Sequence, residues 1–120
     1  MDNKEFSRQL EDRTRKFAIM VIKLSSQLPD TPEGRVIRRQ FSKSGTSIGA
    51  NYREANRSRS KADFVSKIRI CESEASETAY WLEIIEDMNW LKKEKTNPVL
   101  TESNEILAIF TSIVRKLKTN

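Results

Sequence analysis

The sequence contains no histidine and only one cysteine, Cys71. Without histidine, the chain lacks the side chain that most often serves as a general base or metal ligand near neutral pH. A single cysteine excludes an intrachain disulfide and leaves too few thiolate ligands for a structural zinc site. These absences argue against an enzyme and against a bound metal, so we expect no catalytic residues and no cofactor.

Long hydrophobic runs are also missing. No apolar stretch reaches the roughly 18 residues that a membrane-spanning helix needs. The amino-terminal sequence MDNKEFSRQL does not have the apolar core of a signal peptide. We therefore expect a cytoplasmic protein that makes no contact with a membrane.

Glycine and proline are scarce, with three of each among 120 residues. Few helix breakers and many Leu, Ile, Ala, Glu, Lys and Arg favour helix. Apolar residues recur every three or four positions, and Pro29 ends the first helix. The segment Asp30-Thr31-Pro32-Glu33 offers a capping side chain for the second helix, and Ser60 is a typical cap for the third. The pattern predicts a single all-α domain, an antiparallel up-down-up-down four-helix bundle over residues 1–120, with helices at about 3–27, 31–56, 61–89 and 101–117.

Three finer expectations concern how these helices pack. We expect Phe6 to begin the buried stripe of the first helix, and residues 91–100 with Pro98 to form a charged turn. Gly45 and Gly49 each cost about 1 kcal/mol of helix propensity inside the second helix. A helix that keeps both glycines indicates the close approach of a neighbouring backbone.

Charge is unevenly distributed along the chain. The formal net charge is +5, with a pI of about 9.5. Residues 30–61 carry eight bases and three acids, whereas residues 62–91 carry two bases and seven acids. The local excess of positive charge indicates an anionic partner, either a nucleic acid or the acidic segment of another copy.

Most of these bases share one side of the second helix. At about 100° per residue, four arginines between positions 35 and 57 fall in one sector opposite the apolar stripe. Such a row could neutralise phosphates with little sequence preference, although an ordinary solvated helix face has the same pattern. The candidate nucleic-acid-binding residues are those of this helix and its exit: Arg35, Arg39, Lys43, Arg53, Arg57, Arg59 and Lys61.

The third helix carries two lines of residues instead of the single apolar stripe that a monomeric bundle needs. Its core seam has the 4-3-4-3 spacing of a bundle helix and runs through Phe64, Ile68, Cys71, Ala75, Thr78, Leu82 and Ile85. A second line, about 100° away, indicates a further partner. It runs through Ile70, Glu74, Glu77, Trp81, Ile84 and Met88.

Two carboxylates, Glu74 and Glu77, lie on this second line with Trp81. Paired carboxylates can serve acid–base catalysis, but no histidine or nucleophile accompanies them. Because unpaired buried charges are costly, we expect both glutamates to meet arginines such as Arg53, within the subunit or across a subunit boundary. These four residues are therefore assigned to an oligomer interface or to structural ion pairs.

Two motifs resemble those of a known family. Ser47-Ile48-Gly49-Ala50-Asn51-Tyr52-Arg53-Glu54-Ala55 resembles the second-helix motif of the four helix bundle family of bacterial 23S rRNA intervening-sequence proteins. Glu74-Ala75-Ser76-Glu77-Thr78, followed by Tyr80-Trp81-Leu82, resembles its third-helix motif. The resemblance covers about residues 15–118 and implies a ring-like homopentamer with a basic surface. A related protein, the accessory variability determinant of diversity-generating retroelements, is a nucleic-acid-binding partner of a reverse transcriptase.

The leading hypothesis is a non-enzymatic homo-oligomer that binds RNA or DNA through the basic face of the second helix. The alternative is a protein-interaction scaffold or accessory subunit, for example of a reverse transcriptase, without direct nucleic-acid binding. An enzyme comes third, because the chain has no histidine and no motif of a catalytic cleft.

Overall fold

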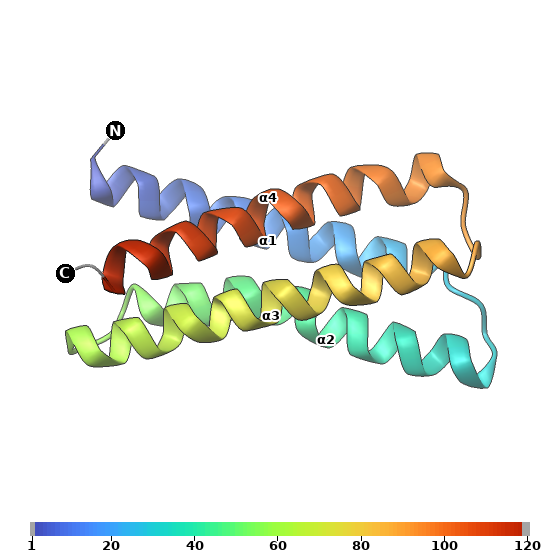
Figure 1. The fold of residues 1–120 in the computed structure, drawn as a ribbon, viewed down its shortest axis with the longest axis horizontal. Helices are drawn as coiled ribbons and strands as arrows, with labels where there is room; N and C mark the ends of the chain where they lie inside the picture. The colour runs from blue at the N-terminus through green and yellow to red at the C-terminus, as the bar shows by residue number, and fades with distance from the viewer. Residues whose placement is uncertain (1, 119–120) are drawn as a thin grey trace.

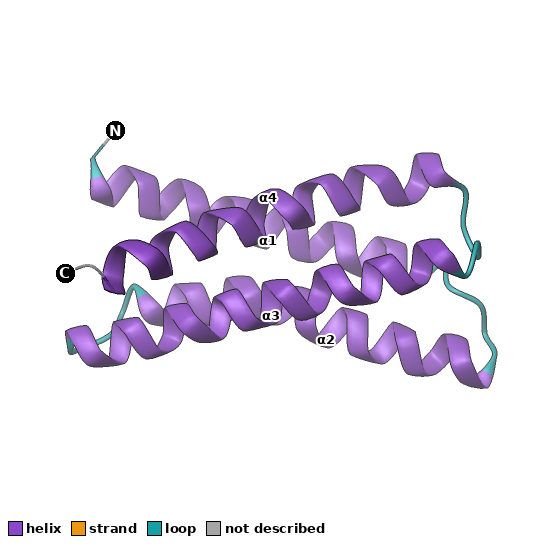
Figure 2. Ribbon diagram, viewed as in Figure 1, coloured by secondary structure: helices purple, strands orange, loops and turns teal. Residues whose placement is uncertain are grey.

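Four long antiparallel helices make up the fold (Figure 1). The computed structural model describes residues 2–118, and within them only short loops join the helices (Figure 2). Each helix packs against its neighbours in sequence, and the last also packs against the first. The predicted all-α four-helix bundle is confirmed, with the bounds α1 (Asn3–Ser25), α2 (Pro32–Ala55), α3 (Lys61–Asp87) and α4 (Lys93–Lys118).

Side-chain caps begin the first three helices. Asp2, Thr31 and Ser60 each accept a hydrogen bond from the backbone N–H three residues ahead, at 2.7–3.1 Å. These bonds satisfy donors that a helix N-terminus otherwise leaves free. After α3, Asn89 takes a left-handed conformation with φ of 55°, which asparagine tolerates better than most residues. The chain can then turn tightly into α4.

The fourth helix starts earlier than the sequence pattern predicted. Residues 91–100 were expected to form a turn around Pro98, but α4 begins at Lys93 and contains the proline. Pro98 removes one backbone donor near the start of the helix. Its neighbours Thr96 and Val99 are only 1% and 5% exposed, so their burial stabilises a helical turn that the proline alone disfavours.

The core follows the predicted stripes with one clear exception. On α3, every seam residue after Phe64 is buried, and Phe64 packs half-buried against the core. Tyr52 of α2 and Phe110 of α4 meet edge to face across the core, with ring centroids 5.5 Å apart. Phe6, predicted to be buried, is 41% exposed, because a side chain in a terminal turn has few neighbours beyond the end of the bundle.

Polar contacts add to the packing of two helix pairs. Arg13 of α1 donates to both carboxylate oxygens of Glu102 on α4, at 2.8 and 2.7 Å, and to Glu105 at 2.8 Å. Between α2 and α3, the buried Thr78 hydroxyl donates to the Ser44 hydroxyl at 3.0 Å. Charge-assisted and buried hydrogen bonds of this kind favour one register of the helices over others.

Helices α1 and α2 approach each other closely at the two glycines, as predicted. A Cβ placed on Gly45 would lie 2.7 Å from both methyl groups of Val21. A Cβ on Gly49 would lie 3.1 Å from the hydroxyl oxygen of Thr14. Val21 and Thr14 are fully buried, so they occupy the space that larger residues on α2 would need.

The substitution Gly45→Ala should lower the free energy of unfolding by up to about 2 kcal/mol. Overpacking a tight core costs ~1–3 kcal/mol, and Val21 is β-branched and cannot easily retract. This cost outweighs the ~1 kcal/mol that alanine gains in helix propensity. Chemical denaturation followed by circular dichroism measures the change.

The matched background for this test is Val21→Ala, which removes the two methyl groups that the new Cβ would meet. In that background Gly45→Ala should cost much less, because the steric conflict is gone. An equal loss in both backgrounds would contradict the close-approach explanation.

Candidate nucleic-acid interface

The basic side of α2 faces away from the core. On the inner side of the helix, Phe41, Ile48 and Tyr52 are at most 2% exposed. The bases lie on the opposite side and along the exit loop, where the structure exposes every candidate residue: Arg35, Arg39, Lys43, Arg53, Arg57, Arg59 and Lys61. A ligand therefore has access to all seven side chains.

These seven bases form two groups at opposite ends of α2. Three lie in the first half of the helix, and the other four lie in its last turn, the following loop and the start of α3. Between Lys43 and Arg53 the helix rises by about 15 Å, and the outer side there carries small side chains such as Thr46 and Ala50. A ligand that contacts all seven bases must follow most of the helix.

Two of the seven bases are engaged in ion pairs. Arg35 Nη1 lies 2.8 Å from a carboxylate oxygen of Asp30, and Arg53 Nε lies 3.7 Å from one of Glu11. Both arginine side chains are 52% exposed, and exposed pairs of this kind are weak. Among residues 2–118 the other five bases form no ion pair. No ion pair within the described residues therefore neutralises these five bases.

The predicted pairing of Glu74 and Glu77 with Arg53 inside one chain is wrong. Glu74 accepts a hydrogen bond from the Ser47 hydroxyl, and Glu77 accepts one from the indole N–H of Trp81 at 3.1 Å. Arg53 instead pairs with a glutamate of α1. The reason is that Ser47 lies on the flank of α2 next to α3, whereas Arg53 lies on the flank next to α1. Pairing across a subunit boundary stays a prediction.

A groove between α1 and α2 was not predicted from the sequence. It has a volume of about 400 Å³, and its lining includes Thr14, Ala18 and Gly49 together with Arg15 and Arg53. In the sequence, the small residues at helical spacing on both helices were the feature that could have indicated this groove. Their juxtaposition depends on how the helices pack, and it brings Arg15 of α1 next to the basic side of α2.

The second line of α3 is covered over only part of its length. Ile70 and Met88 are 41% and 48% exposed, while Trp81 is partly buried against the core. Tyr80 is 56% exposed and meets Trp81 edge to face, with ring centroids 5.1 Å apart. Apolar and aromatic side chains along one helix face are typical of a protein contact surface.

Two observations on the described residues concern metal binding and thiol chemistry. They contain no group of three His, Cys, Asp or Glu residues that could hold a metal ion. Burial raises the pKa of the Cys71 thiol to about 12, and the thiol contacts the carbonyl oxygen of Ile48 at 3.6 Å. At neutral pH Cys71 is therefore an uncharged core side chain and not a nucleophile. None of the described helices has the length and apolar character to traverse a bilayer.

Cys71 should not react with a thiol reagent such as a disulfide dye at about pH 8 while the protein is folded. The raised pKa keeps the thiol protonated there, and burial blocks access. Labelling should become complete when denaturant unfolds the chain. Mass spectrometry measures both states, and rapid labelling of the folded protein would contradict the buried position.

Comparisons with solved structures and with family models place the chain among known proteins. A crystal structure of a protein of unknown function from the S23 ribosomal protein family of Bacteroides thetaiotaomicron is 36% identical, with a TM-score of 0.80. The match covers 88% of this chain and 97% of that one. No curated protein matches. The model of the family described as 23S rRNA-intervening sequence protein matches residues 8–112. The chain belongs to the 23S rRNA-intervening sequence protein family.

Proposed function

We propose that this protein binds RNA or DNA, with low sequence specificity, through the basic residues of α2 and the loop that follows it. The supporting observation is a set of exposed bases that form no ion pair among residues 2–118: Arg39, Lys43, Arg57, Arg59 and Lys61. Lysine and arginine bound to phosphates release counterions, which gives an affinity that falls steeply with salt. Contacts to phosphates carry no direct sequence information, so specificity is low.

The variant with Arg39, Lys43, Arg57 and Arg59 all changed to Gln should bind a single-stranded RNA of about 20 nucleotides much more weakly. Each lost phosphate contact lowers the slope of log affinity against log salt by about 0.7, so the total change is about 3. Fluorescence anisotropy with a labelled RNA across a salt series measures both affinity and slope.

The matched control changes Lys23, Lys92, Lys93 and Lys95 to Gln, which removes the same charge from exposed positions on α1, at the start of α4 and just before it. It should bind almost as well as the wild-type protein. Equal weakening of both variants would show that only net charge matters, and the proposed interface would then be wrong.

The exposed second line of α3 supports an additional role in protein contacts. We propose that another copy of the chain covers Ile70, Trp81 and Met88, which gives a homo-oligomer. The resemblance to ring-forming relatives makes a pentamer the proposed number of subunits. The alternative function rests on the same surface: a scaffold that binds a protein such as a reverse transcriptase, with no direct contact to nucleic acid.

The substitution Ile70→Glu should dissociate the oligomer. A carboxylate placed in an apolar interface loses its hydration without gaining a partner. Light scattering should then report the mass of one chain, 13.9 kDa. The control is Ile19→Glu on α1, where the isoleucine is equally exposed at 41% but lies on another helix. A wild-type protein that is already monomeric at micromolar concentration would refute self-association.

A further inference from the structure

Five segments of the chain gather at one end of the bundle. Figure 1 shows both termini and the loop between α2 and α3 at this end. The first turns of α1 and α3 and the last turns of α2 and α4 surround it, with the loop 56–60 between them. Residues far apart in the sequence therefore border one surface, which we call the loop end.

Basic side chains come to the loop end from four of these segments. Two lie on α1, two in the loop, two on α3 and two on α4: Lys4, Arg8, Arg57, Arg59, Lys61, Lys67, Arg115 and Lys118. All but the half-buried Lys67 are exposed. No ion pair within residues 2–118 involves any of them. Five of these eight bases lie outside α2, the loop that follows it and Lys61, the residue that begins α3.

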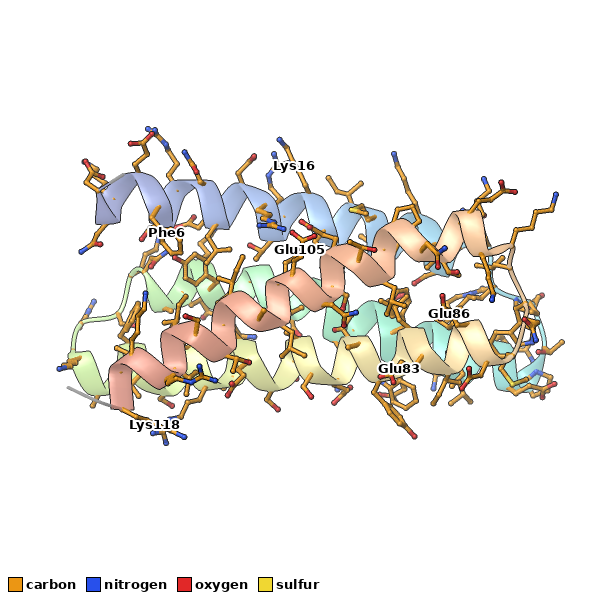
Figure 3. The ribbon with its side chains drawn as sticks, turned by 45° about the horizontal axis from the view of Figure 1, so that its top comes forward. Phe6, Lys16, Glu83, Glu86, Glu105 and Lys118 are labelled. Atoms are coloured by element: carbon orange, nitrogen blue, oxygen red, sulfur yellow. The ribbon has the colours of Figure 1, made fainter. Side chains whose placement is uncertain are left out.

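The acids of the loop end reduce this charge only in part. Glu11 accepts a hydrogen bond from the Asn56 side chain at 2.9 Å and also pairs with an arginine of α2. Asp2 caps α1, which leaves Glu5 in the first turn of α1 and Glu54 and Asp63 beside the bases of the loop. Toward the opposite end, α3 carries acidic residues, of which Glu83 and Glu86 are labelled in Figure 3 together with Lys118 at the loop end.

Two hollows flank the C-terminus of α2 at this end. One has a volume of about 460 Å³, and its lining includes Arg57, Arg59, Lys67, Ser58 and Ser60. The other has a volume of about 370 Å³ and is lined by Lys4, Ser7, Arg8, Glu11 and Asn56. Guanidinium, ammonium and hydroxyl groups all donate hydrogen bonds to phosphate oxygens. Both hollows therefore combine positive charge with donors that suit a phosphate.

We infer that the phosphodiester backbone of a nucleic acid crosses the loop end, where it contacts bases of α1, α3 and α4 as well as those of the loop. This inference rests on the proposed function and places part of its binding site outside α2. Arg8, Lys67 and Arg115 become ligand-binding residues, although no pattern on the second helix points to them. Asn56 lines one hollow, and Arg57, which follows it in the sequence, lines the other.

The test changes Arg8, Lys67 and Arg115 to Gln, which keeps most of each apolar stem and removes three charges. The probe is the labelled single-stranded RNA of about 20 nucleotides, followed by anisotropy between about 50 and 300 mM salt. Three lost phosphate contacts should weaken binding at about 100 mM salt by at least about tenfold and lower the salt slope by about 2. The control with Lys23, Lys93 and Lys95 changed to Gln should stay within about threefold of the wild type.

The outcomes separate this inference from the proposed function. If the loop-end variant binds as tightly as its control while the four-base α2 variant is weakened, the loop-end site is wrong and the proposed function stands. If the wild-type protein binds no RNA at about 50 mM salt, both fail. Thermal melting by circular dichroism checks that the variant is folded. If it is not, Arg8→Gln and Arg115→Gln are tested singly, each with an expected loss of about fivefold.

Discussion

The contact between α1 and α2 at Gly45 sets the direction in which the basic side of α2 faces. Val21 occupies the space above the glycine, so a side chain there would collide with two methyl groups. This contact, together with the burial of Phe41 and Ile48, fixes the rotation of α2 about its own axis. A rotation by one residue position, about 100°, would turn charged side chains toward the core at a large cost in hydration. The basic side of α2 therefore faces solvent because the packing of its apolar side fixes the rotation of the helix.

The antiparallel topology then decides how charge is arranged in space. In the sequence, the bases of residues 30–61 form one basic block followed by an acidic one. In the bundle, the first half of α2 lies beside the acidic half of α3, while its second half meets the basic ends of other helices. The long axis of the molecule measures 45 Å, several times the screening length in physiological salt. The two ends therefore present separate electrostatic environments to a charged ligand.

The periodicity of apolar residues predicted the fold well, because residues three or four positions apart lie on the same side of any helix. The α3 seam from Ile68 to Ile85 is buried as expected, since the spacing alone places these residues on one side. Pro98 misled the prediction of the start of α4, because local propensity is weaker than the burial of Thr96 and Val99. The partner of Arg53 could not be derived from the sequence either. Spacing gives the side of α2 on which Arg53 lies, but it does not say which neighbouring helix packs against that side.

The sequence by itself determined that the chain is helical, where its apolar stripes lie, and that one side of the second helix is basic. These properties follow from local spacing, which is the same in any helix. Only the tertiary structure decided that Glu74 bonds to Ser47, that Arg53 pairs with Glu11, and that bases from α1, α3 and α4 join the loop at one end. Such neighbours depend on the register and rotation of packed helices. Those are set by the contacts of many buried side chains together and not by any single stretch of sequence.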